Sequence, residues 1–426
     1  MKRNVLAGTL ILTLAVASPA AEPNFAPLIS DPVSLAPNGA NPTVAFDAKT
    51  GARLVAWIRP GTSSLEVVVS RSRDDGRDYG DPVVVSAGDA GIVSSVVSPA
   101  QVAVAPNGEI YVLYEHLVPS PYFERGRGIP RLARSTNGGH SFTTPVDVIA
   151  AEEVETGAEM ADLAIASDGS VVVAWLDYRD AFERAKLPEG QRPKVWLDRG
   201  RTTVEVRLAR STDGGASFAP SVLIAKTASE SSRVKLAIAP DGTYFIAWRA
   251  KLNPYKGSYD SVRDVMISAS SDRGVTWSTP VKVHDDRFKA SRCPEITHGI
   301  GVDSKGRLHV AWYTGTSARP GIYYAVSADR GNTFSAPLPL LTDGWVPYAD
   351  VKLAVDGSDH VWVTYEDRRD DRADQMVLAE IDPQGNPARL GQWPGRAPDI
   401  AAKAGAVMLV WTGAKGEIQT LQAALK

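Results

Sequence analysis

The stretch Ser270-Ser271-Asp272-Arg273-Gly274-Val275-Thr276-Trp277 decides the fold, because the same eight-residue pattern recurs four more times along the chain. In every copy a serine is followed by Asp or Asn at the third position, Gly at the fifth and an aromatic residue at the eighth. The other copies span residues 72–79, 135–142, 211–218 and 327–334. Such short side chains hydrogen-bond nearby backbone N–H groups, and glycine accepts a positive φ, so the pattern predicts a hairpin turn. We expect the aromatic ring to fold back onto the apolar layer between neighbouring sheets.

A second repeat is a short β-rich run that ends in Trp or Tyr. It occurs seven times, at residues 54–57, 111–114, 172–175, 245–248, 309–312, 362–365 and 408–411. Most copies follow an Asp-Gly, Asn-Gly or Lys-Gly pair, which indicates a hairpin before each run. The repeating unit is therefore predicted to contain an inner strand, a Gly turn, the aromatic-ended strand, a loop, a third strand, the eight-residue turn and a fourth strand.

Four antiparallel strands per unit predict an all-β fold, a single β-propeller over residues 21–426 with seven blades and six as the alternative. The last unit, residues 399–421, runs out after three strands. The N-terminal stretch Asp31-Pro32-Val33-Ser34-Leu35 resembles the fourth-strand sequence Asp81-Pro82-Val83-Val84-Val85. We therefore expect it to pair with the last blade and close the ring, which removes two exposed sheet edges.

The eight-residue turn resembles the Asp box, or BNR repeat, of the sialidase superfamily, and five copies in register cover almost the whole chain. The resemblance implies an exported propeller that is sialidase-like. Asp boxes are structural turns that also occur in propellers with other activities, so they carry no catalytic role by themselves. Enzymatic sialidases have six blades, and the predicted seventh is a departure from that family.

Residues 1–20 have a basic start, an apolar run and a small-residue end, which predicts a signal peptide and an exported protein, periplasmic or extracellular. No later segment is long enough to insert into a membrane. The formal net charge of −3 gives no reason to expect nucleic acid as a partner. No metal-binding spacing or cofactor motif is present, so we expect neither a metal nor a cofactor. The single cysteine, Cys293, excludes an intramolecular disulfide and is interpreted as a buried apolar residue or, alternatively, a reactive thiol.

Aligning the predicted inner strands brings seven polar residues into one register. They are Thr43, Gln101, Asp162, Lys235, Glu295, Asp350 and Asp399. Because side chains alternate along a strand, a shared register puts all seven on the same side, near the mouth of the central channel. They form either a ligand site or a set of hydrogen bonds to the adjacent blade.

Two long loops, predicted over residues 115–131 and from Asp177 to about Thr203, belong to the face that carries the connections between blades. They contain charged residues that could line an anion site, namely Arg125, Arg127, Arg131, Asp177, Arg179, Arg192 and Arg199. A solvated rim is the alternative. Asp177-Tyr178-Arg179 and Asp367-Arg368-Arg369 follow their aromatic-ended strands at equivalent distances, and this repetition favours an Asp/Arg pair that stiffens each loop.

The sialidase resemblance also implies catalytic residues. Tyr348, before the sixth inner strand, looks like the family's nucleophile, and Arg249 and Arg292 are placed like two of its three substrate-binding arginines. Arg233 and Lys235 stand where the assisting glutamate would be expected, so Glu295 is the replacement candidate, because a tyrosine nucleophile needs a nearby base. The first arginine of the family is missing, since this chain has Asn41-Pro42-Thr43 there.

The sequence therefore supports two interpretations. In the first, the exported propeller binds an acidic sugar or glycan on its inter-blade face and acts as an exo-glycoside hydrolase of sialidase type. Tyr348, Glu295, Arg249 and Arg292 are then catalytic, and the candidate ligand-binding residues are Asp162, Lys235, Asp350, Asp399, Arg179, Asp177 and Arg233. In the second, the protein is a non-catalytic module of the cell envelope that binds a protein or a glycan.

Overall fold

The computed structural model describes residues 27–153, 155–191, 203–230, 232–252, 261–290, 298–344, 346–347, 349–369, 374–403 and 405–424. The predicted signal peptide lies outside these residues, as do Tyr348, Arg292, Cys293, Glu295, Arg192 and Arg199. No helix within the described segments is long and apolar enough to cross a membrane.

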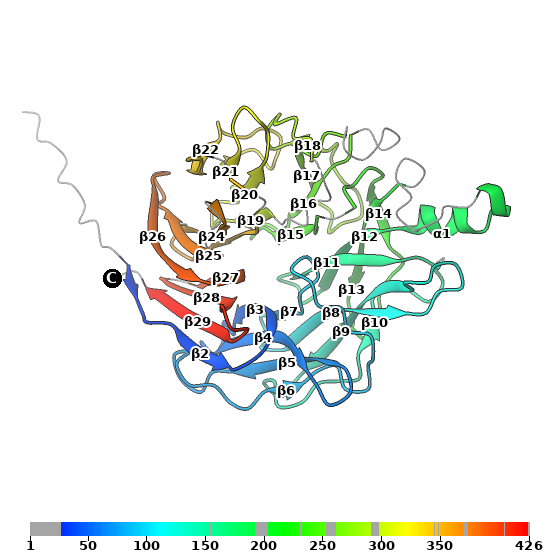
Figure 1. Cartoon of the computed structure of the whole chain (residues 1–426), viewed down its shortest axis with the longest axis horizontal. Coiled ribbons are helices and arrows are strands. Elements are labelled where there is room, and N and C mark those ends of the chain that lie inside the picture. The colour runs from blue at the N-terminus through cyan, green and yellow to red at the C-terminus, as the bar shows by residue number, and fades with distance from the viewer. Residues whose placement is uncertain are drawn as a thin grey trace, which may run out of the picture.

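Seven antiparallel sheets stand around a central channel like the blades of a propeller, which confirms the predicted fold class and blade number (Figure 1). The first four blades follow the chain in order. Blade one contains β3 (Ala40–Phe46), β4 (Arg53–Pro60), β5 (Leu65–Arg71) and β6 (Val83–Val84). Blade two contains β7 (Gln101–Val104), β8 (Ile110–Val118), β9 (Arg127–Ser135) and β10 (Val146–Asp147). Blade three contains β11 (Ala158–Ile165), β12 (Val171–Asp177), β13 (Glu205–Ser211) and β14 (Val222–Ala225). Blade four contains β15 (Lys235–Ile238), β16 (Tyr244–Arg249), β17 (Val265–Ser270) and β18 (Val281–Lys282).

The remaining blades repeat this order, and the last one recruits the N-terminus. Blade five contains β19 (His298–Val302), β20 (Leu308–Thr314), β21 (Gly321–Ser327) and β22 (Leu338–Leu341). Blade six contains β23 (Val351–Val355), β24 (Val361–Asp367), β25 (Gln375–Ile381) and β26 (Pro387–Pro394). Blade seven contains β27 (Arg396–Lys403), β28 (Ala406–Thr412) and β29 (Ile418–Ala424), with β1 (Leu28–Ile29) and β2 (Val33–Ala36).

The ring closes through the N-terminal strands. Val33 lies opposite Thr420 in the β2–β29 pair, and Leu28 lies opposite Ala424 in the β1–β29 pair, both antiparallel. The predicted pairing of residues 31–35 with the last blade is therefore confirmed. As a result the outer edge of β29 is covered by strands from the opposite end of the chain.

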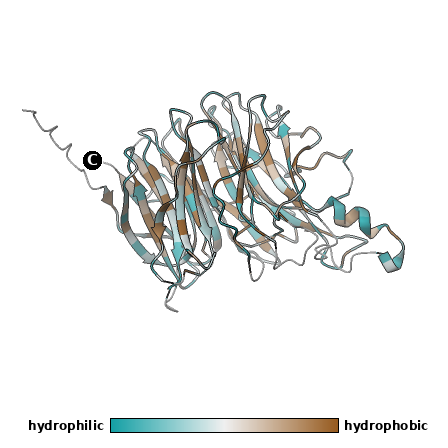
Figure 2. Cartoon of the chain, turned by 90° about the horizontal axis from the view of Figure 1, so that it is seen from above, coloured by the Kyte–Doolittle hydropathy of each residue, from teal (hydrophilic) through white to brown (hydrophobic). Residues whose placement is uncertain are grey.

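The aromatic residues that end the second strands fill the layers between blades. All seven are buried: Trp57, Tyr114, Trp175, Trp248, Trp312, Tyr365 and Trp411. Seen from the side, the strands carry alternating apolar and polar segments between loops, and the short helix α1 (Arg179–Ala185) projects from one flank (Figure 2). A 3-10 turn at Glu189–Gln191 follows α1.

The two faces of the ring differ in what they carry. The face with the connections between blades and the loops after each second strand is called here the inter-blade face, and the opposite one the turn face. The predicted long loop over residues 115–131 is wrong in extent, because β8 continues to Val118 and β9 begins at Arg127. Hydrogen bonds between β8 and β9 extend the hairpin into a segment whose polar residues had suggested a loop. The connection between the two strands is therefore limited to residues 119–126.

The eight-residue turns form the hydrogen bonds expected of them. In blade four, Asp272 Oδ1 accepts from the Thr276 amide at 2.9 Å, and Ser270 Oγ accepts from the Gly274 amide at 2.8 Å. Gly274 has φ +88°. The aromatic residue is less covered than expected, because Trp277 is only partly buried against the core between blades three and four. Its indole N–H donates to the Gly274 carbonyl at 3.1 Å.

Turn glycines also fix the spacing between blades. A Cβ built on Gly215 would lie 2.5 Å from Leu132 Cδ2 in blade two, so a larger residue would force the Leu132 side chain to shift. Gly169, by contrast, has a similar positive φ but nothing within 4 Å of the same position. A substitution at Gly169 therefore tests backbone strain alone, whereas a substitution at Gly215 tests backbone strain together with a steric clash between blades.

We expect Gly215→Ala to destabilise the protein more than Gly169→Ala. Both variants place a side chain at positive φ, which costs about 1–2 kcal/mol, but Gly215→Ala adds an overpacking cost of about 1–3 kcal/mol. Denaturant unfolding of both variants measures the difference. Equal unfolding free energies would show that the turn does not space the blades.

Deletion of residues 21–36 should lower the melting temperature and broaden the unfolding transition. The deletion removes β1 and β2, exposes the edge of β29 and uncovers the apolar side of blade seven. Differential scanning calorimetry checks this expectation. Cooperative melting at the wild-type temperature would contradict the closure of the ring by the N-terminus.

Candidate functional site on the inter-blade face

The inner strands present polar side chains in one register, but two members of the predicted set are wrong. In each blade the register is defined by the residue that pairs with the position just before the second-strand aromatic. Blade five places Gly299 there, opposite Ala311, and blade six places Lys352 there, opposite Thr364. Asp350 lies two residues before this position, and Glu295 lies outside the described residues. The structure moves the register by four residues in blade five and by two in blade six, because pairing with the second strand, and not the polar pattern of the inner strand, sets it.

Most of these side chains bond the backbone of the next inner strand. The bonds run from Thr43 Oγ1 to the Ala100 carbonyl (2.7 Å), from Gln101 Nε2 to the Ala161 carbonyl (2.8 Å), from the Leu236 amide to Asp162 Oδ2 (2.7 Å) and from the Val44 amide to Asp399 Oδ2 (3.0 Å). Inner strands of neighbouring blades share no ladder, so these bonds satisfy amides and carbonyls that would otherwise be buried without a partner. Of the two predicted alternatives for these residues, a ligand site or hydrogen bonds to the adjacent blade, the structure shows the second for these four.

The charged members of the register neutralise one another. Asp162 Oδ1 lies 2.5 Å from Arg233 Nη2 and 2.8 Å from Lys235 Nζ. Burial raises the pKa of Asp162, but Lys235 and Arg233 outweigh it and hold that pKa below its ordinary value. Burial raises the pKa of Asp399 despite the opposing charges of Lys352 and Lys235. About 10 Å³ of space lies beside Lys352 and Asp399, too little for a sugar at that position.

Two further predicted groups are held in internal contacts. Arg249 is buried and donates to the carbonyls of Arg263 and Tyr313, at 2.9 and 2.6 Å, between blades four and five. Burial lowers its pKa to about 10. Arg179 donates two hydrogen bonds to Asp177, from Nε at 2.8 Å and from Nη2 at 2.9 Å. Arg369 and Asp367 repeat that geometry, which agrees with the predicted Asp/Arg pair that stiffens each loop.

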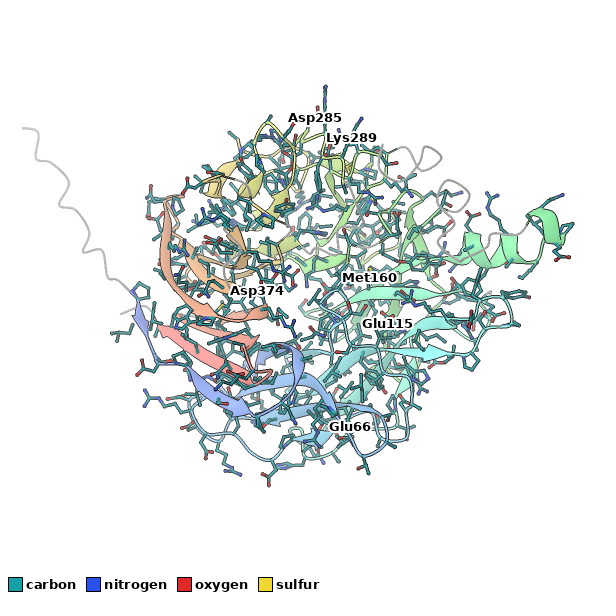
Figure 3. All side chains as sticks on the ribbon, in the orientation of Figure 1. Glu66, Glu115, Met160, Asp285, Lys289 and Asp374 are labelled. Atoms are coloured by element: carbon teal, nitrogen blue, oxygen red, sulfur yellow. The ribbon has the colours of Figure 1, made fainter. Side chains whose placement is uncertain are left out.

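A pair of buried glutamates, missed in the sequence, lies between blades two and three. Glu115 follows Tyr114 at the end of the second strand of blade two. Glu159 precedes Met160, whose φ of +56° belongs to a β-bulge at the start of β11. The bulge turns the Met160 amide toward Glu115 Oε2, which accepts from it at 3.2 Å. Figure 3 places Glu115 and Met160 near the middle of the ring, on the side of blades two and three.

The second oxygens of these two glutamates lie near the same position, beside Gly128. A Cβ built on Gly128 would lie 2.7 Å from Glu115 Oε1 and 2.9 Å from Glu159 Oε1, so both atoms border one small space. Neither Oε1 has a hydrogen-bond partner among the described residues, although Glu115 is only 5% exposed and Glu159 only 2%. Two ionised carboxylates this close repel each other strongly, so the arrangement favours one proton between them.

Electrostatics agrees with a protonated pair. Burial, and next the charge of Glu115, raise the pKa of Glu159 to about 8. Burial also raises the pKa of Glu115. Arg125 opposes both shifts, with Nη2 at 3.4 Å from Glu159 Oε2, and its side chain is 48% exposed. A partly exposed cation therefore lies next to the buried pair.

Blade six repeats part of this arrangement across the channel. Glu366 follows Tyr365, as Glu115 follows Tyr114, and its Oε1 accepts from the amide of Ala397 at 2.8 Å. Ala397 has φ +50° at the bulge that begins β27. Burial, and then Asp350, raise the pKa of Glu366. Arg368 lies 2.9 Å from Glu366 with its side chain 36% exposed. A glutamate directly after the aromatic was the available sequence signal in both blades.

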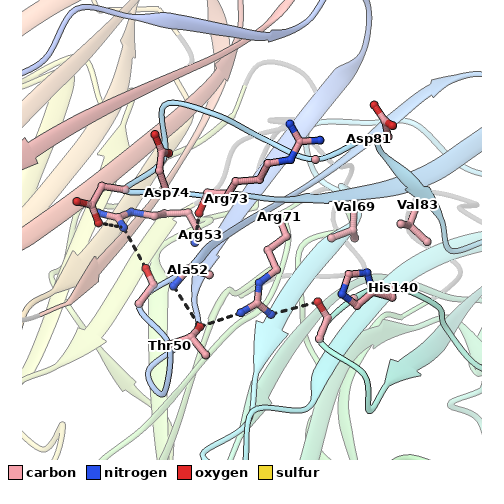
Figure 4. Close-up of a pocket in the computed structure, with 16 residues that line it drawn as sticks. Thr50, Ala52, Arg53, Val69, Arg71, Arg73, Asp74, Asp81, Val83 and His140 are labelled. Carbon is pink, nitrogen blue, oxygen red and sulfur yellow. Dashed lines mark hydrogen bonds and ion pairs between the residues drawn. The ribbon is translucent and has the colours of Figure 1, made fainter.

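A groove of about 930 Å³ lies on the turn face between blades one and two (Figure 4). Arg71 crosses it, donating to the Gly138 carbonyl at 3.1 Å and to Thr50 Oγ1 at 2.9 Å. Arg134 makes the matching bond to Gly214 in the next blade. Because this contact repeats, we interpret Arg71 and Arg134 as structural links between neighbouring blades.

Comparison with known proteins supports the fold alone. No protein-family model and no curated protein sequence matches the chain. An ulvan lyase of polysaccharide lyase family PL25, bound to -[GlcA(1-4)Rha3S]-, shares 12% identity over 91% of this chain and 94% of its own, with a TM-score of 0.56. An α-L-arabinofuranosidase from Fusarium graminearum, solved with an iminosugar inhibitor, shares 12% identity over 93% and 98%, with a TM-score of 0.52. A Hadza microbial sialidase shares 15% identity over 87% and 73%, and its TM-score of 0.49 carries no argument here.

Replacing Asp162 by Asn should destabilise the protein by about 3–5 kcal/mol, because Arg233 and Lys235 would keep their charges in a buried site without a carboxylate. The matched control is Asp168→Asn in the same blade, where the carboxylate is 32% exposed and pairs with Arg210 on the surface. That change should cost about 0–1 kcal/mol. Chemical denaturation measures both. Similar costs would mean that Asp162 does not hold the blades together.

Proposed function

We propose that this protein is an exported, sialidase-like propeller that binds an acidic glycan on its inter-blade face and cleaves a glycosidic bond there. The observation that carries the proposal is the pair of half-exposed arginines, Arg125 and Arg368, on opposite sides of the channel, each beside a buried carboxylate. A guanidinium binds a sugar carboxylate or sulfate through paired N–H donors. Each arginine is held in place by its glutamate, so little side-chain freedom is lost when a ligand binds.

The proposed catalytic residues combine the sequence and the described face. Tyr348 is the proposed nucleophile, Glu295 its base and Arg292 a further ligand contact. All three come just before inner strands, and those strand starts meet at the centre of this face. Asp350 stands two residues beyond Tyr348 in the sequence, and its charge contributes to the raised pKa of Glu366. The neighbours of similar fold include enzymes named for cleaving glycans, and the ulvan lyase was solved with a uronate-containing ligand.

A second candidate function, a non-catalytic binding module of the cell envelope, rests on a different observation. Arg249, Asp177, Arg179, Asp162 and Arg233 are all engaged in internal bonds, so much of the predicted charge on this face stabilises the ring. A module of this kind needs only the exposed rim. The two candidates differ in whether Tyr348 is required for turnover.

Arg125→Ala and Arg368→Ala should each weaken binding of an acidic oligosaccharide at least about tenfold, because a hydrogen bond to a charged group contributes about 1.5–3 kcal/mol. Isothermal titration calorimetry with glucuronate- and sialate-containing oligosaccharides measures the change. The matched control is Arg59→Ala, an arginine on the same face that pairs with Glu66. Equal losses in all three variants would remove the specific role of Arg125 and Arg368.

Fluorogenic glycosides then separate the two candidate functions. Tyr348→Phe should abolish hydrolysis and leave oligosaccharide affinity nearly unchanged, because only the nucleophilic oxygen is removed. Wild-type protein that binds acidic oligosaccharides but hydrolyses none of the glycosides would favour the binding module.

A further inference from the structure

We propose that Glu159 is the proton donor of the inter-blade face, that Glu115 positions it, and that Arg125 covers it until an anionic ligand binds. This inference rests on the proposed function and adds an acid to it. The resemblance to sialidases did not identify a proton donor among the residues of this chain.

The proposal stands first on geometry. Glu159 and Glu115 come from neighbouring blades, and their free Oε1 atoms border the space that the missing side chain of Gly128 leaves open. The other oxygen of Glu115, Oε2, accepts hydrogen bonds from Ser98 Oγ at 2.6 Å and from the Met160 amide at 3.2 Å. Glu115 is thus fixed as an acceptor. Among the described residues, the side chain that pairs with Glu159 is Arg125, at 3.4 Å, and the Gly128 amide also lies beside its carboxyl group. Glu159 is therefore the less tightly held of the two and is the member that turns toward a ligand.

Charge in the surroundings sets which member carries the proton. The groups that face Glu159 are Glu115 from β8, Arg125 from the loop after β8, and Tyr178 before α1, with Glu230 beyond Tyr178. Burial and Glu115 favour the neutral acid, and Arg125 opposes them. When the anionic group of a ligand neutralises Arg125, that opposition weakens. Binding therefore uncovers Glu159 and keeps its proton in place at the same time.

The step balances as a glycosidase reaction. The O–H bond of Glu159 breaks as its proton moves to the leaving oxygen, and the C–O bond breaks with its electron pair going to that oxygen. Water supplies the oxygen that ends on the anomeric carbon and returns its remaining proton to Glu159, so the acid is regenerated.

The test uses Glu159→Gln in the full-length protein with two glycosides that differ in leaving group. Hydrolysis of a substrate with a poor, alkoxide-like leaving group should fall by about 10²–10⁴-fold, because its oxygen needs a proton. Hydrolysis of an activated aryl glycoside should change far less. Glu66→Gln, on the same face, is the matched control and should affect neither substrate. A purely structural role for Glu159 would slow both substrates alike, and that result would overturn the proposal.

A second variant keeps the proposal open to refutation if Glu159→Gln folds poorly. Glu115→Gln removes the neighbouring charge but leaves the acid, so the alkaline limb of the pH–rate profile should move to lower pH. An unchanged alkaline limb would overturn the coupling.

Carbon-13 NMR of labelled glutamate carboxyls gives a readout that needs no activity. Glu159 should titrate above neutral pH in the wild type, and an ordinary carboxyl titration would overturn the inference. Wild-type protein that hydrolyses no glycoside would instead refute the hydrolase itself, whatever the NMR titration shows.

Discussion

Four of the seven blades are joined to the next blade by hydrogen bonds between an inner-strand side chain and the neighbouring backbone. Neighbouring sheets in a propeller pack face to face and share no ladder, so the inner strands have no regular partner on the side of the channel. Thr43, Gln101, Asp162 and Asp399 supply that partner at the same register in four blades. Because an unpaired buried amide costs about 1–3 kcal/mol, the ring needs these residues regardless of any ligand.

The same requirement explains why the inner strands carry many charged side chains that neutralise one another. Asp162 neutralises Arg233 and Lys235, and only a small space remains beside Lys352 and Asp399. Gly299 adds to the closure, since a Cβ there would lie 2.5 Å from the Leu353 amide nitrogen. Blades five and six therefore approach more closely than a side chain would allow.

Backbone strain and buried carboxylates occur together on that upper face. Met160 and Ala397 adopt positive φ at bulges, and in each case the amide that the bulge frees is accepted by a glutamate from the preceding blade. The glutamates are buried because the bulges need an acceptor, and their pKa values rise because they are buried. The raised carboxyl pKa values and the backbone strain on this face thus have one structural origin, and a partly exposed arginine pairs with a glutamate at each of the two places.

The sequence by itself determined the architecture. Five copies of the eight-residue turn and seven aromatic-ended runs are local signals, and each is written in residues that are close together along the chain. The pairing of residues 31–35 with the last blade also followed from a local resemblance. The register of Gly299 and Lys352 did not, because it is set by how β19 and β23 pair with the second strands of their blades.

Only the tertiary structure decided which charges are available. Arg249 looked like a ligand contact in the sequence, yet it donates to Tyr313, which lies 64 residues away. Glu115 and Glu159 looked unrelated, yet their oxygens border one space that a glycine leaves open. Burial and partnership depend on contacts between blades, and those contacts join residues that no spacing along the chain connects.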